Sequence, residues 1–110
     1  MADNSEQKTA CIRSLNDALR RCGSGGRIMM TAGIDALGSE KRARVLSAVA
    51  AFDNFNEDND PYEEHDCATL RVADIRVLFK IDLYEEPEVK AADGQPATTR
   101  VLTIMLADEW

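Results

Sequence analysis

The sequence predicts an α+β protein, a single mostly antiparallel sheet of about four strands with two helices on one face. Two observations predict this class. In the first half of the chain the apolar residues recur at spacings of three and four, the period of one helical face. After residue 66 the spacing changes to two, which is typical of a strand with one buried face. The chain has 110 residues, so we assign 1–110 to a single domain.

The first half contains the two predicted helices. The first covers 5–22, where Ser5 can cap the start and the glycine cluster at 23–26 ends the helix. The second covers 39–53 and ends where Asn and Asp residues begin to compete for the backbone. Between them, the apolar run 27–31 predicts a short strand, followed by a connector with room for one helical turn.

The second half contains the strands. Residues 67–84 are predicted as an antiparallel hairpin, because apolar and polar residues alternate on both sides of Ala73 and Asp74. Residues 85–98 contain two prolines and many polar side chains, and are predicted as a loop. The last strand, 100–107, is apolar on both faces, which predicts a central or covered position in the sheet.

The stretch between the second helix and the hairpin concentrates negative charge. Residues 53–66 contain seven carboxylates and the only histidine, and no Lys or Arg lies between Arg44 and Arg71. The whole chain has 20 acidic and 13 basic residues, so removing these seven leaves 13 against 13. The net charge of −7 is therefore local, which indicates a site.

Composition excludes several classes of function. An acidic chain lacks the Lys and Arg excess that gives affinity for nucleic acid, so we expect no direct nucleic-acid binding. No apolar run reaches membrane-spanning length, so we expect no membrane association. Cys11 and Cys22 share a predicted helix at a separation too long for a disulfide, and the cysteine count is odd. Reduced thiols of this kind are typical of a cytoplasmic protein, and we expect no cofactor.

Four interpretations of the acidic stretch follow from its residue types. Asp58, Asp60, Glu64 and Asp66 with His65 could bind Mg²⁺, Mn²⁺ or Ca²⁺ through hard donors. His65 between two carboxylates could instead act as a general base, with Cys67 among the candidate nucleophiles. The Asn, Asp and Pro residues could simply turn the chain. Finally, a row of carboxylates could present a binding surface to a basic partner.

We favour the binding surface, and therefore a non-enzymatic role, because it accounts for the uninterrupted charge. The predicted surface is Asp53, Glu57, Asp58, Asp60, Tyr62, Glu63, Glu64, His65 and Asp66. We assign no catalytic and no metal-binding residue. The partner is expected to be a basic protein surface, and the sequence is compatible with a homo-oligomer. The alternative is an enzyme that uses carboxylate-bound metal or a histidine, with an unknown substrate.

Several motifs carry a family resemblance: Asp58-Asn59-Asp60-Pro61-Tyr62 with Glu64-His65-Asp66, Lys80-Ile81-Asp82 with Tyr84, and Thr99 to Ala107 with Glu109. Over roughly residues 12–110 the chain resembles a bacterial family known as domain of unknown function number 3768. It departs from that pattern at Cys67-Ala68 and at Trp110. The resemblance implies no accepted activity. It does imply a bacterial protein whose gene often lies near plasmid or prophage genes. We therefore expect a mobile-element inhibitor of a CRISPR or restriction complex, of the anti-CRISPR or anti-restriction type.

Overall fold

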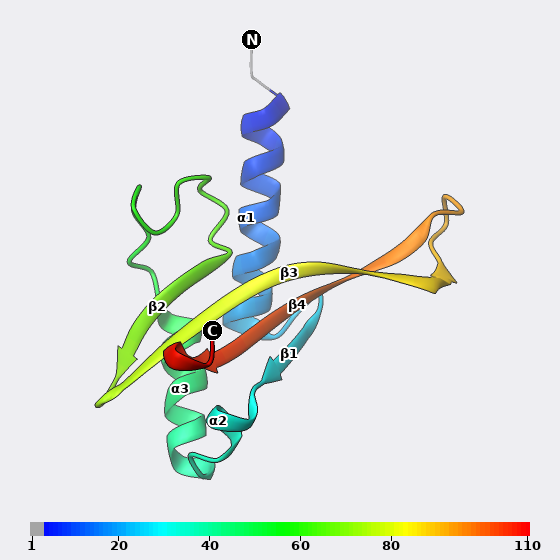
Figure 1. Ribbon diagram of the computed structural model, residues 1–110. Helices are drawn as coiled ribbons and strands as arrows, with labels where there is room; N and C mark the ends of the chain where they lie inside the picture. Colours follow the sequence, from blue (N-terminus) through cyan, green and yellow to red (C-terminus); the bar gives the residue numbers. More distant parts are fainter. Residues whose placement is uncertain (1–3) are drawn as a thin grey trace.

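Four strands form one sheet in the order β1-β4-β3-β2 in the computed structural model, which describes residues 4–110 (Figure 1). The strands are β1 (Arg27–Met30), β2 (Cys67–Val72), β3 (Ile75–Lys90) and β4 (Pro96–Leu106). The β2–β3 and β3–β4 pairs are antiparallel, whereas β1 pairs with β4 in parallel. The predicted class is confirmed as α+β with a mostly antiparallel sheet. The first three residues of the predicted domain 1–110 lie outside the described part.

The helices supply the apolar layer behind the sheet (Figure 1). They are α1 (Asn4–Cys22), the short α2 (Ala32–Asp35) and α3 (Ser39–Ala51), so α3 ends two residues earlier than predicted. At the end of α1 the amide of Gly23 donates to the carbonyl of Leu19, and the positive φ of 69° at Gly23 favours glycine there. No helix in residues 4–110 has both the length and the apolar character needed to cross a membrane.

The core lies between these helices and one face of the sheet. Leu19 of α1, Ile34 of α2 and Val45 and Val49 of α3 are buried against that face. The sheet contributes alternate residues of its two central strands, as the period of two predicts: Val77, Phe79, Ile81, Leu102 and Ile104. Because β4 is flanked by β1 and β3, the prediction of a central last strand is also confirmed.

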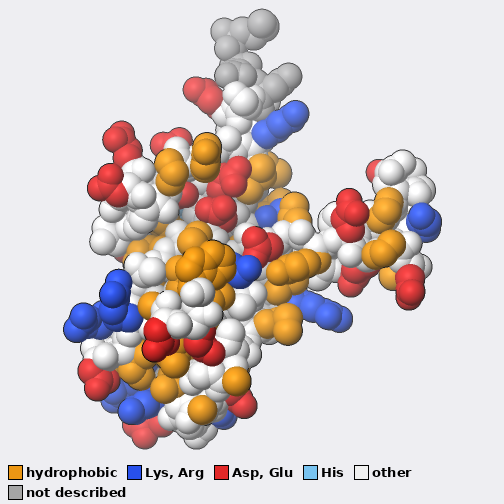
Figure 2. All heavy atoms as spheres, viewed as in Figure 1, with side chains coloured by type: hydrophobic (Ala, Val, Ile, Leu, Met, Phe, Trp, Pro, Cys, Tyr) orange, Lys and Arg blue, Asp and Glu red, His pale blue; other side chains and the backbone are white. Residues whose placement is uncertain are grey.

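The predicted loop at 85–98 is wrong, because the two central strands continue far beyond the body of the protein. Residues face each other in register from Leu83 and Arg100 to Glu86 and Ala97. This paired extension, residues 83–100, is called the arm. Arg100 at its base donates to Asn16 Oδ1 of α1, and the outer part stands clear of the body (Figures 1 and 2). Backbone pairing outweighs the weak strand preference of its Glu and Pro residues. Pro87 lies in the irregular stretch between Glu86 and Lys90, where a proline is tolerated in a strand.

The C-terminal turn, η1 (Ala107–Glu109), folds back onto the segment after β1. The carboxylate of Glu109 accepts hydrogen bonds from the Thr31 hydroxyl at 2.7 Å, the Leu106 amide at 2.8 Å and the Gly33 amide at 3.2 Å. The Thr31 hydrogen bond is the main cause that lowers the pKa of Glu109. Glu109 therefore ties the end of β4 to the start of α2.

Candidate functional site

The acidic loop, residues 53–66, connects α3 to β2 without regular secondary structure. Its own amide side chains hold the first half in shape. Asn56 Oδ1 accepts from the amides of Asp58 at 2.9 Å and Asn59 at 3.1 Å. Asn59 in turn accepts from the Asn56 amide and donates to the Asn54 carbonyl. These asparagines therefore act as turn residues, as the structural interpretation of the loop expects.

Asp60 is the interior support of the second half of the loop. Only 5% of its surface is exposed, and its Oδ1 accepts from the amides of Glu64 and His65, both at 3.1 Å. Glu63 and His65 have positive φ angles of 58° and 55°, a backbone conformation that non-glycine residues rarely adopt. The carboxylate of Asp60 stabilises this tight turn, so its own charge faces inward and is not presented at the surface.

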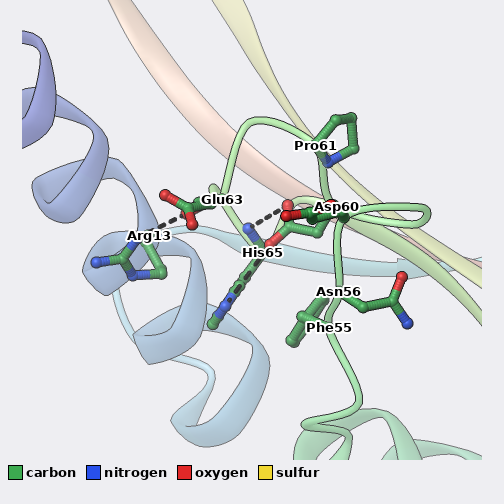
Figure 3. Close-up of a pocket in the computed structure, with 8 residues that line it drawn as sticks. Arg13, Phe55, Asn56, Asp60, Pro61, Glu63 and His65 are labelled. Atoms are coloured by element: carbon green, nitrogen blue, oxygen red, sulfur yellow. Dashed lines mark hydrogen bonds and ion pairs between the residues drawn. The ribbon is translucent and has the colours of Figure 1, made fainter.

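One face of α1 binds the backbone of the same turn (Figure 3). Arg13 donates to the carbonyl of Glu63 at 2.9 Å. Asn16, on the same helix, donates to the carbonyl of Glu64 at 2.9 Å. Asn16 is itself almost fully buried. Since these partners are 50 and 48 residues apart in the sequence, the loop receives its conformation from a distant helix. Neither α1 residue was predicted from the sequence to have this role.

Arg20 joins α1 to the start of the loop. It is 3% exposed and donates to the carbonyls of Val49, Ala50 and Phe52 at 2.9, 3.1 and 2.6 Å. Its charge therefore lies at the C-terminal end of α3, where the helix dipole favours a cation. The guanidinium also lies 5.2 Å from the centre of the Phe55 ring. In the sequence, the only indication that Arg20 binds these carbonyls was its position next to the apolar face of the first helix.

His65 is oriented by residues other than its sequence neighbours. Its Nδ1 lies 2.9 Å from Asp17 Oδ1, its Nε2 lies 3.7 Å from Asp60 Oδ2, and its ring stacks on Phe55 at 3.9 Å. Burial alone would raise the pKa of Asp17, but hydrogen bonds from His65 and Arg20 outweigh it and lower that pKa. Asp17 and Asp60 therefore hold the imidazole.

At Asp66 and Cys67 the chain leaves the loop and enters the sheet. The Asp66 carbonyl accepts from the Ile81 amide at 2.7 Å, which brings the chain into the sheet. Burial raises the pKa of the Asp66 carboxyl, and the charges of Asp60 and Asp82 add to this. Burial also raises the pKa of the Cys67 thiol, so little of it is the nucleophilic thiolate.

The outer surface of the acidic loop carries the remaining predicted residues. Tyr62 is 77% exposed, and the surrounding carboxylates are exposed as well: Asp53, Glu57, Asp58 and Glu63. Within residues 4–110 none of these four carboxylates forms an ion pair. Glu64, His65 and Asp66 are only half exposed. The predicted surface therefore divides into an exposed outer group and an inner group that shapes the turn.

A hollow of about 530 Å³ lies between this turn and α1. Arg13, Phe55, Glu57, Glu63 and His65 contribute to its wall (Figure 3). The wall combines one guanidinium, one imidazole and several carboxylates. In the described part of the chain, His, Cys, Asp and Glu side chains form no group of three arranged to hold a metal ion.

These features define a small α+β protein whose acidic loop is fixed by a distant helix. Residues 30–109 match the family described as "Protein of unknown function (DUF3768)", and the chain belongs to this family. The match confirms the resemblance. It includes the acidic loop, the arm and Glu109, whereas α1 lies outside the matched range. Neither a curated protein nor a solved structure matches the chain.

Proposed function

We propose that this protein is a cytoplasmic protein-interaction module that presents its acidic loop to a basic surface of a partner protein. One observation carries the proposal. The loop backbone is held by Arg13, Asn16 and Asp60, while Glu57, Asp58 and Glu63 project outward without ion-pair partners in residues 4–110. The contact group consists of Asp53, Glu57, Asp58, Tyr62 and Glu63.

A fixed loop favours binding because its conformational entropy is already lost before the partner arrives. The exposed carboxylates raise the rate of encounter with a basic groove through long-range attraction. Tyr62 adds a large amphipathic side chain, a residue type enriched at interface hot spots. Together, these properties support a binding role that requires no chemical step.

The proposed partner is a bacterial complex that handles nucleic acid, of the CRISPR or restriction kind, and the protein would act as its inhibitor. Such complexes bind phosphate backbones through grooves rich in Lys and Arg. Carboxylates on a fixed loop offer a comparable row of negative charges to the same groove. Occupation of that groove would exclude the nucleic acid.

A second candidate is a histidine-dependent enzyme. The observation that favours it is the hydrogen bond between His65 and Asp17 beside the hollow, because a carboxylate that orients an imidazole is a recurrent element of general-base catalysis. The Nε2 atom of His65, however, lies 3.7 Å from the Asp60 carboxylate. The raised pKa of Cys67 makes that thiol a poor nucleophile. We therefore place this candidate second.

The test begins with capture of the partner from a bacterial lysate and its identification by mass spectrometry. Association rates are then measured for the variant Glu57→Gln, Asp58→Asn and Glu63→Gln. A matched control carries Glu40→Gln, Asp74→Asn and Glu88→Gln, which remove the same charge from exposed positions elsewhere. Asp60 is left intact because it supports the turn.

We expect the loop variant to associate at least about tenfold more slowly at low salt, and the deficit to shrink at high salt as steering is screened. Its melting temperature should match that of the control. Equal association rates for the two variants would mean that total charge, and not the acidic loop, attracts the partner. A loop variant with unchanged binding would overturn the proposal.

A further inference from the structure

Along the arm, the outer edge of β3 has no neighbouring strand in the described part of the chain. β2 pairs with β3 only from Ile75 to Lys80, and the Asp66 carbonyl then occupies the Ile81 amide. β3 continues to Lys90, and from Leu83 onward β4 is its only paired strand within residues 4–110. The bare edge therefore begins beyond Cys67, the first residue of β2, and a strand added there would continue the line of β2 (Figure 1).

The backbone groups of this edge point away from β4. Successive residues in an antiparallel ladder direct their N–H and C=O groups to alternate sides. Because the Ile81 amide points to the β2 side, the backbone groups of Leu83 and Glu85 point to the same side. Pro87, the next residue of this series, has no N–H and ends the row. The Ile81 amide is already bound by Asp66, so the edge from Leu83 to Glu86 is the part that offers donors and acceptors to an added strand.

The side chains around this edge show which kind of strand fits. Leu83 is 59% exposed and Tyr84 is 49% exposed, so apolar surface is available on both faces of the edge. Two carboxylates accompany them, those of Glu85 and Glu86, whereas the neighbouring Asp82 already pairs with Lys80 at 3.0 Å. Figure 2 shows hydrophobic and acidic side chains along the arm, with a smaller basic area near its tip. Basic and apolar side chains on an added strand would complement this surface, whereas a second copy of this edge would oppose carboxylate to carboxylate.

We propose that the β3 edge from Leu83 to Glu86 is a docking site for an extended basic segment of a partner protein, which adds to the sheet as a further strand. Main-chain hydrogen bonds to Leu83 and Glu85 would give affinity, and charge would select basic sequences. This edge does not include the contact group of the acidic loop, so the inference stands whether or not that loop binds.

The test uses a short synthetic peptide of alternating lysine and valine and follows amide hydrogen exchange by NMR. With excess peptide, the amides of Leu83 and Glu85 should exchange at least about tenfold more slowly, because they become hydrogen bonded. The Tyr84 amide, which points toward β4, should change much less. A peptide of alternating glutamate and valine should give no protection.

Two controls separate strand addition from simple charge attraction. The same lysine–valine peptide with alternate N-methyl groups keeps its charge but cannot pair along one side, and it should give no protection. Glu85→Pro removes one outward N–H of the protein and should weaken binding of the unmodified peptide.

Three outcomes would overturn the proposal. The first is unchanged exchange at Leu83 and Glu85 in excess lysine–valine peptide. The second is equal protection by the N-methylated peptide, which would mean that side chains alone are contacted. The third is protection without peptide that rises with protein concentration, which would assign the edge to a second copy of this chain.

Discussion

The acidic loop and the arm lie on either side of α1 in Figure 1. Different interactions stabilise the conformations of these two segments. The loop has no regular secondary structure, yet Arg13, Asn16 and Asp60 bind its backbone. The arm has a regular ladder, yet Leu83 and Val89 remain largely exposed. The comparison teaches that regular pairing gives a segment its form, whereas attachment to the body requires buried partners from another element.

The largest expected effect comes from breaking the attachment of the loop to α1 at Arg20. Arg20→Met leaves the carbonyls of Val49, Ala50 and Phe52 without their donor. Because Arg20 is buried, we expect a loss of about 3 kcal/mol or more in the free energy of unfolding, measured by urea denaturation. Arg21→Met, at the exposed neighbouring position, should change it little. Similar losses for both would mean that the Arg20 contacts are dispensable.

A smaller effect is expected at the inner support of the turn. Asp60→Ala removes the acceptor of the Glu64 and His65 amides and should cost about 2 kcal/mol. Faster amide hydrogen exchange at these two residues, with no change along the arm, would locate the loss in the loop. Asp58→Ala, at an exposed loop position, is the control and should stay within about 0.5 kcal/mol. If the amides of Glu64 and His65 stay protected in Asp60→Ala, the turn has another support.

The attachment of the loop should also depend on pH through Asp17. A carboxyl with a lowered pKa in the folded state contributes stability above its unfolded pKa and loses it as the pH falls through the folded value. Unfolding free energy should therefore fall as the pH drops below about 4, and it should fall less steeply in Asp17→Asn. The raised pKa of the Asp66 carboxyl makes stability change with pH in the opposite direction, and it does so in both proteins. The difference between the pH profiles of the unmodified protein and Asp17→Asn therefore reports on Asp17. Parallel pH profiles would contradict the prediction.

The smallest effect is expected when the arm is shortened. Glu86 and Ala97 face each other, so Asn-Gly in place of residues 87–96 would close the hairpin with a two-residue turn. Because the outer arm adds nothing to the core, the free energy of unfolding should stay within about 1 kcal/mol in urea denaturation. A larger loss would show that the arm supports the body. The lysine–valine peptide should still protect Leu83 and Glu85 in this variant.

The sequence predicted what depends on local pattern. Periods of three to four and of two located α1, α3 and the paired start of the hairpin, because one face of each element is buried. We did not predict the arm, because its Glu and Pro residues are typical of a loop. Whether such a stretch forms a strand depends on its pairing with another segment of the chain. Asp93-Gly94 was the available signal, since Gly94 forms the turn at the tip with a φ of 81°.

The charge pattern of the sequence located the acidic loop, but it did not identify the residues that support the loop from inside. The concentration of carboxylates marked the right stretch, and the outer residues Glu57, Asp58 and Glu63 are exposed as a surface requires. Composition could not separate them from Asp60, because an outward and an inward carboxylate are identical in a sequence. The partners on α1 could not be found either, since they meet the loop only through the tertiary fold.

The position of β4 in the middle of the sheet has a consequence for synthesis. β1 is made early, whereas β4, the strand with which it pairs, is the last of the strands within residues 4–110 to be made. Until the ribosome releases β4, the sheet lacks its centre, and β1 keeps an unpaired edge that includes the apolar residues Ile28, Met29 and Met30. Long-range closure of this kind slows folding and prolongs the exposure of such edges. The nascent chain therefore cannot complete its sheet before β4 is made.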